Sequence, residues 1–332
     1  MYGVFIQPMG QSEDATSIAE RRRMSTFQTA MKAVLPFLHD PLVLDILLNA
    51  DGAIWIDRAG EGMSRTAATM SSEQAETALK LVAALVGEEF NPQHPLLETE
   101  LDLSDLGRLR VEAALPPISE APVFAIRKPA ALVFSLDDYV HRSILSADQA
   151  AKLTAAVKSR ANILVGGGTG TGKTTFANAL LRVIAETGDR VYIVEDTKEL
   201  QCEAPNHIRL RVRQGVATWQ QLIAAAMRFR PTRIVVGEVR DASALDLIDA
   251  WNTGHPGGLA TVHANNTSAM LDRLCQLTER VVLRAPKASI AEAINVLVHL
   301  ERAPNHPAGR VVTAIDRVDG LASDGSWRLS PL

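Results

Sequence analysis

The sequence has few of the features that mark specialised classes of protein. Only two of its 332 residues are cysteines, Cys202 and Cys275, and they lie far apart, so neither a zinc module nor a disulfide framework is expected. No apolar run approaches the roughly 20 residues that a bilayer requires, so no transmembrane helix is expected. The N-terminus carries its arginines after its apolar residues, the reverse of a secretory signal. These absences favour a reducing, cytoplasmic location.

A strong net charge is also missing. The chain has 34 lysines and arginines against 38 aspartates and glutamates, a net charge of -4, so no global field attracts nucleic acid or anionic lipid. Any site for a polyanion must therefore be local. The apolar fraction of 47% is that of an ordinary globular protein. At about 150 residues per domain, the length predicts two domains.

The pattern of apolar residues changes partway along the chain. Residues 1–25 are expected to be a flexible tail. Two stretches with helical spacing, the first over 26–39, and several short strands closed by prolines predict an α+β domain over 26–130. The mixed segment 131–147 is expected to be a linker. From 148 to 332, helices alternate with short strands rich in valine and isoleucine, which predicts a parallel α/β sheet.

A glycine-rich motif follows the first of these strands. Residues 167–174 read G-x-x-x-x-G-K-T between a buried-strand run and a helical pattern, the context of a P-loop. Glycines there let backbone N–H groups converge on a phosphate, and the helix N-terminus adds partial positive charge. Lys173 would reach the β and γ phosphates of ATP, and the Thr174 hydroxyl would bind Mg²⁺. The expected nucleotide-binding residues are Gly167, Gly168, Thr169, Gly170, Thr171, Gly172, Lys173, Thr174 and Thr175.

Three polar side chains end further strands of the expected sheet. Glu195 and Glu238 are expected near the phosphates or Mg²⁺, because the carboxyl ends of parallel strands line one crevice. Solvated charges at strand ends are the alternative. His263 would sense the γ-phosphate if strand 258–264 lies beside strand 233–238, whereas an isolated histidine is more often structural.

Arginines gather between residues 207 and 240, where seven stand against one acid. Strand alternation places Arg209, Arg211 and Arg213 on one face. Such a face could hold nucleic-acid phosphates, a neighbouring subunit's nucleotide, acidic side chains across an interface, or only solvent, and the sequence leaves these open. The absence of interleaved aromatic residues argues against binding of single strands.

The order of the motifs resembles that of the type II/IV secretion traffic ATPases. VGGGTGTGKTT, VEDTKEL, AMRFRPTRIVVGEVRD and GHPGGLATVHANNTSAMLDRL are similar to their Walker A, Asp box, Walker B and His box. Upstream, DPLVLDILLNADGAIWIDRAGEGM, LRVEAALPPISEAPVFAIRKPA and FSLDDYV resemble the conjugative transfer branch of the family. The resemblance extends from about residue 26 to residue 300.

This resemblance implies an N-terminal α+β domain followed by a RecA-like P-loop ATPase domain, in a ring that is usually a hexamer. It implies a cytoplasmic Mg²⁺-dependent ATPase, associated at its periphery with inner-membrane secretion or conjugation components. Glu238 would polarise the attacking water, Glu195 would support the metal and His263 would report the γ-phosphate. From the N-terminal domain, Arg110 and Arg127 would bind nucleotide phosphates.

The expected function is therefore hydrolysis of ATP to power conjugative DNA transfer or type IV secretion. A motor of the pilus retraction type and a nucleic-acid-binding P-loop adaptor are the alternatives. The lack of a tetracysteine module favours the conjugative or retraction branch over type II secretion, and the DPLVLDILLNADG stretch favours conjugation.

Overall fold

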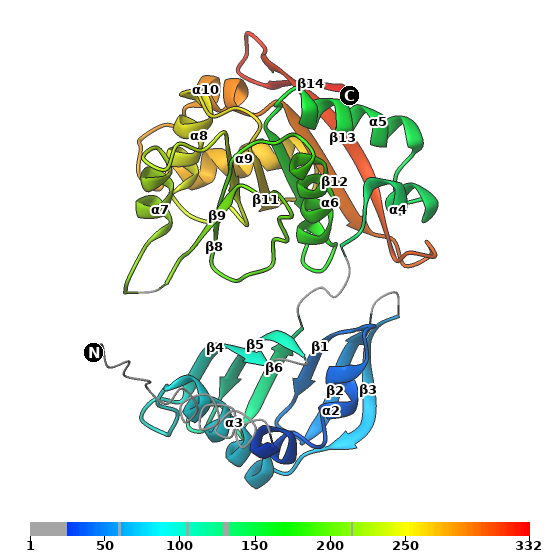
Figure 1. The fold of residues 1–332 in the computed structure, drawn as a ribbon, viewed down its shortest axis with the longest axis vertical. Helices are drawn as coiled ribbons and strands as arrows, with labels where there is room; N and C mark the ends of the chain where they lie inside the picture. The colour runs from blue at the N-terminus through cyan, green and yellow to red at the C-terminus, as the bar shows by residue number, and fades with distance from the viewer. Residues whose placement is uncertain (1–24, 59–60, 104–105, 129–132, 214) are drawn as a thin grey trace, which may run out of the picture. The chain divides into compact units, whose positions relative to one another are not determined.

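The computed structural model describes residues 25–332 except 59–60, 104–105, 129–132 and 214. The expected tail lies outside these residues apart from Ser25. The described residues form two compact units, one within Met1–Ala131 and the other within Leu132–Leu332 (Figure 1). Among them, no helix combines the length and the apolar character that crossing a membrane would need.

The first unit is built on a six-stranded antiparallel sheet of order β3-β2-β1-β6-β5-β4. The helix expected over 26–39 is divided into a helical segment at 25–30 and a short helix, α2. Pro36, in the first turn of α2, has no backbone N–H to continue the preceding helix. The elements are α2 (Leu35–His39), β1 (Val43–Leu48), β2 (Ala53–Arg58), β3 (Gly62–Thr69), α3 (Ser72–Val86), β4 (Leu96–Leu103), β5 (Gly107–Ala114) and β6 (Val123–Arg127).

Helix α3 supplies much of the cover for this sheet. It begins at a capping box in which Ser71 and Gln74 satisfy each other's backbone N–H groups, and it ends at Gly87, whose φ is 77°. Its buried face includes Leu79 and Val82, which belong to one apolar core with residues of the sheet such as Ile46. Both α2 and α3 lie on the same side of the strands (Figure 1).

The second unit holds an eight-stranded sheet of order β14-β13-β12-β7-β11-β10-β8-β9. The strands from β12 to β9 are parallel, as the alternation of strands and helices predicts, and β13 and β14 extend the sheet in antiparallel fashion. The strands are β7 (Ile163–Gly167), β8 (Val191–Glu195), β9 (His207–Arg211), β10 (Arg233–Val236), β11 (Leu259–His263), β12 (Val296–Arg302), β13 (Arg310–Leu321) and β14 (Trp327–Pro331).

Helices cover both faces of this sheet, so the unit has three layers. In β7, Ile163 and Val165 enter the core beneath one helical layer while Leu164 enters the core on the opposite face. The first layer contains α4 (Leu136–His141), α5 (Ala147–Lys158) and α6 (Lys173–Ala185); the second contains α7 (Trp219–Ala226), α8 (Ala244–Asn252), α9 (Thr267–Thr278) and α10 (Lys287–Ala293).

Helix α4 forms where the sequence analysis expects a linker. Ser135 caps its N-terminus, and Leu136 and Tyr139 are buried in the core of the second unit. The Tyr139 ring meets the Phe176 ring of α6 edge to face, with centroids 5.0 Å apart. Residues 136–141 are therefore part of the second unit rather than a connection, because their apolar side chains are used for packing.

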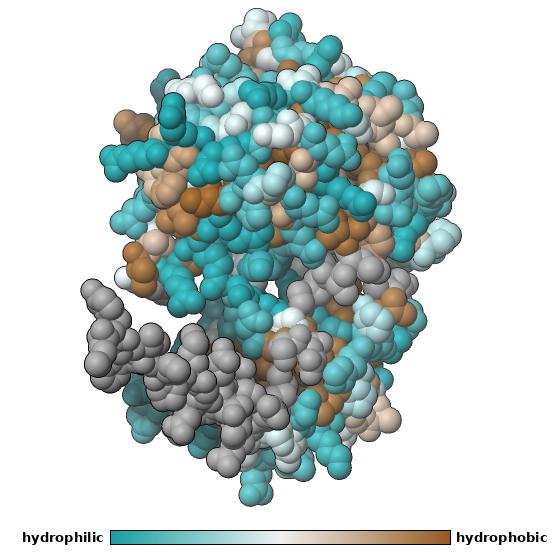
Figure 2. All heavy atoms as spheres, viewed as in Figure 1, coloured by the Kyte–Doolittle hydropathy of each residue, from teal (hydrophilic) through white to brown (hydrophobic). Residues whose placement is uncertain are grey.

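Hydrophilic side chains cover most of the visible surface of both units, and the apolar ones form small separate patches (Figure 2). The large apolar side chains are instead collected in the interior of each unit. This distribution is that of a globular protein with a polar exterior.

Candidate active site

The glycine-rich motif joins strand β7 to helix α6. All five residues of β7 are buried, and α6 begins at Lys173 directly after Gly172. Gly167, Gly170 and Gly172 have φ angles of 155°, 70° and 91°, a backbone conformation that residues with a side chain rarely adopt. The predicted strand, loop and helix are thus present, and the loop leads into a helix N-terminus that favours anions.

Lys173 is held across this loop. Lys173 is only 8% exposed. The ammonium donates to the Gly168 carbonyl at 2.9 Å and lies 3.3 Å from His263 Nδ1. A lysine buried to this extent with its charge among polar groups of the loop is preorganised to meet a phosphate there.

His263 lies at the end of β11, paired in register with Gly167 of β7. Strand β11 is the neighbour of β10, as the predicted sensing role required. The His263 Nε2 atom is 3.4 Å from Glu238 Oε1. Burial lowers the pKa of His263 below 6.5, the Lys173 charge lowers it further, and Glu238 opposes them. A neutral ring accepting from Lys173 at Nδ1 and donating to Glu238 at Nε2 satisfies both neighbours.

Glu238 follows β10 in a segment that β11 holds in place. Thr261 donates its hydroxyl to the Gly237 carbonyl at 2.7 Å, and the Val239 amide donates to the Thr261 carbonyl at 2.9 Å. The Glu238 side chain keeps an exposed fraction of 27%. The structure therefore brings together Lys173, His263 and Glu238, with a carboxylate that water can still reach.

Glu195 is engaged differently from the metal-supporting role that the sequence analysis gives it. It is 1% exposed, and its Oε2 atom accepts from the backbone N–H groups of Glu199 and Leu200, both at 3.0 Å. Its Oε1 atom forms an ion pair with Arg209 Nη1 at 2.9 Å. Burial raises the pKa of Glu195, and the Leu200 amide and Arg209 oppose that rise. Both oxygens have partners in the loop after β8 and in β9, an arrangement that favours a structural role for Glu195 over the predicted metal role.

A magnesium site at the P-loop needs few protein ligands. No group of three or more histidine, cysteine, aspartate or glutamate side chains within the described residues is arranged to hold a metal ion. Mg²⁺ in nucleotide sites is usually bound by one or two protein oxygens together with phosphates and water. Thr174, at the second position of α6 and half-buried, fits this requirement.

The predicted arginines of the first unit are neighbours. Arg110 in β5 and Arg127 in β6 are directly opposite in register. Arg127 Nε donates to Asp45 Oδ1 at 2.9 Å, and Arg110 Nη2 donates to Glu98 Oε1 at 3.0 Å. The two guanidiniums therefore share one region of the first sheet and already face carboxylates.

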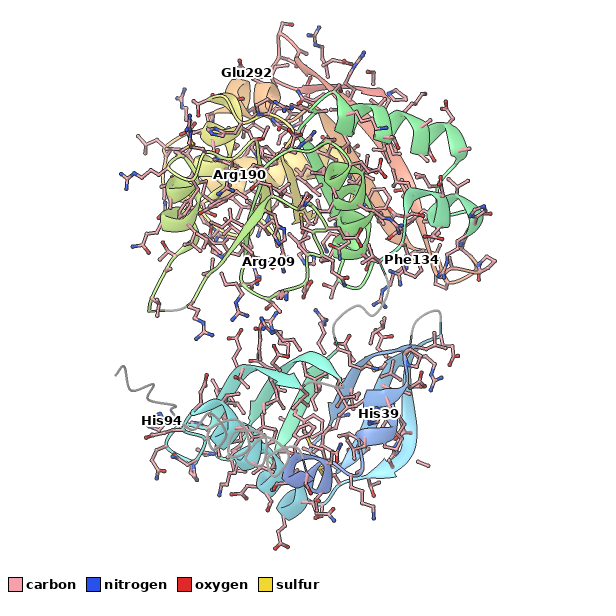
Figure 3. All side chains as sticks on the ribbon, in the orientation of Figure 1. His39, His94, Phe134, Arg190, Arg209 and Glu292 are labelled. Carbon is pink, nitrogen blue, oxygen red and sulfur yellow. The ribbon has the colours of Figure 1, made fainter. Side chains whose placement is uncertain are left out.

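The arginine-rich segment is largely tied into its own unit. Arg209, labelled in Figure 3, pairs with Glu195, and Arg240 pairs with Asp196. Arg233 is 1% exposed and bound to Asp189. Strand β9 ends at Arg211, so Arg213 lies beyond it, bridged to Ala217. The expected face of three strand arginines is therefore not formed as such.

Sequence reasoning missed two arginines beside the P-loop, Arg302 and Arg310. They end β12 and begin β13. The segment VLVHLER, an apolar strand that ends in an arginine, was the available signal. The sequence does not show, however, that this strand lies next to β7, because that depends on the order of strands in the sheet.

Comparison with known proteins defines the class of this molecule. The family described as "Type II/IV secretion system protein" matches residues 28–313, and the chain belongs to this family. It is 42% identical over 288 residues to the probable conjugal transfer protein TrbB of Sinorhizobium fredii, an alignment that covers 86% of each protein.

Solved structures of similar fold agree with this membership. The Legionella pneumophila ATPase DotB matches with a TM-score of 0.63 at 19% identity, covering 85% of this chain and 78% of DotB. The pilus retraction motor PilT with bound ADP matches with a TM-score of 0.62 at 19% identity, covering 90% and 84%. The predicted fold, an α+β unit followed by a RecA-like P-loop unit, is confirmed.

Proposed function

We propose that the chain hydrolyses ATP to ADP and phosphate, with Mg²⁺, and uses the reaction to power conjugative DNA transfer or type IV secretion. The observation that carries the proposal is the cluster of Lys173, His263 and Glu238 on a P-loop in a member of the secretion family. Such a hydrolysis needs a cationic phosphate ligand and a group that orients the attacking water in one place. In this chain His263 lies between the two.

Each side chain has a specific role in this proposal. The loop amides and Lys173 would neutralise the phosphates, so that the ammonium would exchange its contact with His263 for the nucleotide. Glu238 would orient the attacking water and accept its proton, while the neutral His263 would hold that carboxylate in position. Thr174 would hold Mg²⁺, whose chemistry when bound is neutralisation of phosphate charge. Arg110 and Arg127 would supply further positive charge to the nucleotide in an assembled ring.

The proposal includes a homo-hexameric, cytoplasmic protein that docks on inner-membrane components of a conjugation or secretion apparatus. Conjugation is favoured over pilus retraction because the 42% identity is to a protein named for conjugal transfer, whereas PilT is only 19% identical. Direct binding of nucleic acid is the weaker alternative, because Arg209, Arg233 and Arg240 are used in ion pairs within the unit.

Two measurements test the proposal. Lys173→Ala should abolish DNA transfer when it replaces the wild-type protein in conjugating cells, whereas Lys152→Ala, which removes an exposed pair with Asp148, should not. Light scattering of the purified protein with Mg²⁺ and a non-hydrolysable ATP analogue should give the mass of six subunits. Transfer at the wild-type frequency by Lys173→Ala would refute the motor role, and a monomer under all conditions would refute the ring.

A further inference from the structure

The hairpin of β12 and β13 runs beside the P-loop. Strand β12 pairs with β7 in parallel, with Leu300 opposite Gly167, the first glycine of the loop. Two residues further along β12 stands Arg302, and directly opposite it on β13 stands Arg310. Residues paired across antiparallel strands have their side chains on the same face. Both arginines therefore emerge together at the edge of the loop.

Their guanidinium groups lie against the glycines of the loop. A Cβ atom built on Gly170 would collide with the Arg302 guanidinium, and one built on Gly172 would collide with that of Arg310. Arg310 Nη1 also lies 3.5 Å from the Thr171 carbonyl oxygen. The two guanidinium groups therefore lie against residues 170–172, the part of the loop that directly precedes Lys173.

This arrangement carries an uncompensated positive charge. Like charges directly opposite each other on paired strands are destabilising. Arg302 is exposed, and within the described residues its guanidinium has no hydrogen-bonding or ion-pair partner. The adjacent Glu301 is turned to His299, with Oε1 3.7 Å from Nδ1. An anion placed between the arginines and the loop would remove this repulsion, and arginine forks are suited to phosphate.

We propose that Arg302 and Arg310 form an arginine pair that binds the phosphate chain of the nucleotide held by the P-loop of the same chain. The inference rests on the proposed function and extends it to residues of the second unit. It predicts that part of the affinity for nucleotide comes from the β12–β13 hairpin, independently of Arg110 and Arg127.

The test is calorimetric titration of the full-length protein with Mg²⁺-ATP. The double variant Arg302→Ala, Arg310→Ala should bind about 10- to 100-fold more weakly, because it would lose the charge-assisted hydrogen bonds to phosphate. A lysine double variant, which keeps the charge but loses the fork, should be intermediate. Tripolyphosphate has no base or sugar, and its affinity can be measured by competition with ATP. This affinity should fall in the same order, from the wild type to the lysine double variant to the alanine double variant.

Arg317→Ala is the matched control, because Arg317 lies on the same strand β13 and is paired with Asp319 at 2.8 Å. It should bind ATP like the wild type. Unchanged ATP affinity in the alanine double variant, with wild-type binding intact, would overturn the arginine pair alone. Absence of ATP binding by the wild type would overturn the proposed function and this inference together.

Discussion

Replacing Asp189 with alanine should destabilise the second unit severely. Its carboxylate accepts from Arg233 Nε at 2.6 Å and from Arg160 Nη2 at 2.5 Å. Arg233 is 1% exposed, and its remaining nitrogens donate to the carbonyls of Gly257 at 3.1 Å and Val157 at 3.0 Å. Asp189→Ala would leave a buried guanidinium with hydrogen bonds but without a counter-charge. Removal of one partner of such a pair costs about 3–5 kcal/mol.

Urea unfolding followed by tryptophan fluorescence measures this loss, because the buried Trp251 reports on the same unit. Asp319→Ala is the control: it breaks an exposed pair with Arg317, and such pairs contribute about 0–1 kcal/mol. A loss below about 1 kcal/mol in Asp189→Ala would refute the argument that Arg233 depends on this carboxylate.

The ion pair of Asp189 and Arg233 also predicts how the stability changes at acid pH. Burial alone would raise the pKa of Asp189, but hydrogen bonds from Arg233 and Thr187 outweigh it and hold the pKa below 3.8. A group whose pKa is lowered by folding stabilises the protein above its unfolded pKa, and this contribution is lost as the pH falls through the folded value. The stability difference between the wild type and Asp189→Ala should therefore shrink below about pH 4.

Two further predictions concern the site. The pKa of His263 is lowered by burial and by Lys173, so the ring is neutral near pH 7; protonation at lower pH would add a cation beside Lys173 and hold Glu238 as a counter-ion. Turnover of the wild type should fall as the pH drops below 6.5, and His263→Gln should lack this acid limb; an identical limb in the variant would contradict the assignment. Glu195→Gln should lower the stability by about 1–3 kcal/mol, because it weakens the buried contact with Arg209. It should leave the Mg²⁺ concentration for half-maximal activity unchanged, whereas a large shift would restore a metal role for Glu195.

The second unit is the part of the fold that the sequence predicts best. Its inner parallel strands β7, β8 and β10 are mostly apolar and are buried along their whole length, which is the pattern of strands covered on both faces. In the first unit, β3 could not be recognised in this way, because none of its residues is buried. Strand β4 does alternate, with Leu97, Leu101 and Leu103 inward, so a signal was present there.

The site was predictable where it follows from one motif and unpredictable where it depends on neighbouring strands. The P-loop and Lys173 come from a continuous segment, whereas the contact of Lys173 with His263 requires β11 to lie beside β7. Glu195 ends a strand as expected, but Arg209 of the adjacent β9 forms an ion pair with it. That ion pair could not be predicted, because it depends on which strand lies next to β8.

The measurement that tests the central claim most directly is phosphate release from Mg²⁺-ATP by the wild type and Glu238→Gln, with ATP binding measured in parallel. If Glu238 is the base beside the P-loop, the variant should bind ATP like the wild type but hydrolyse it about 100- to 10,000-fold more slowly. Hydrolysis by Glu238→Gln at the wild-type rate would contradict the assignment of the active site to Lys173, His263 and Glu238.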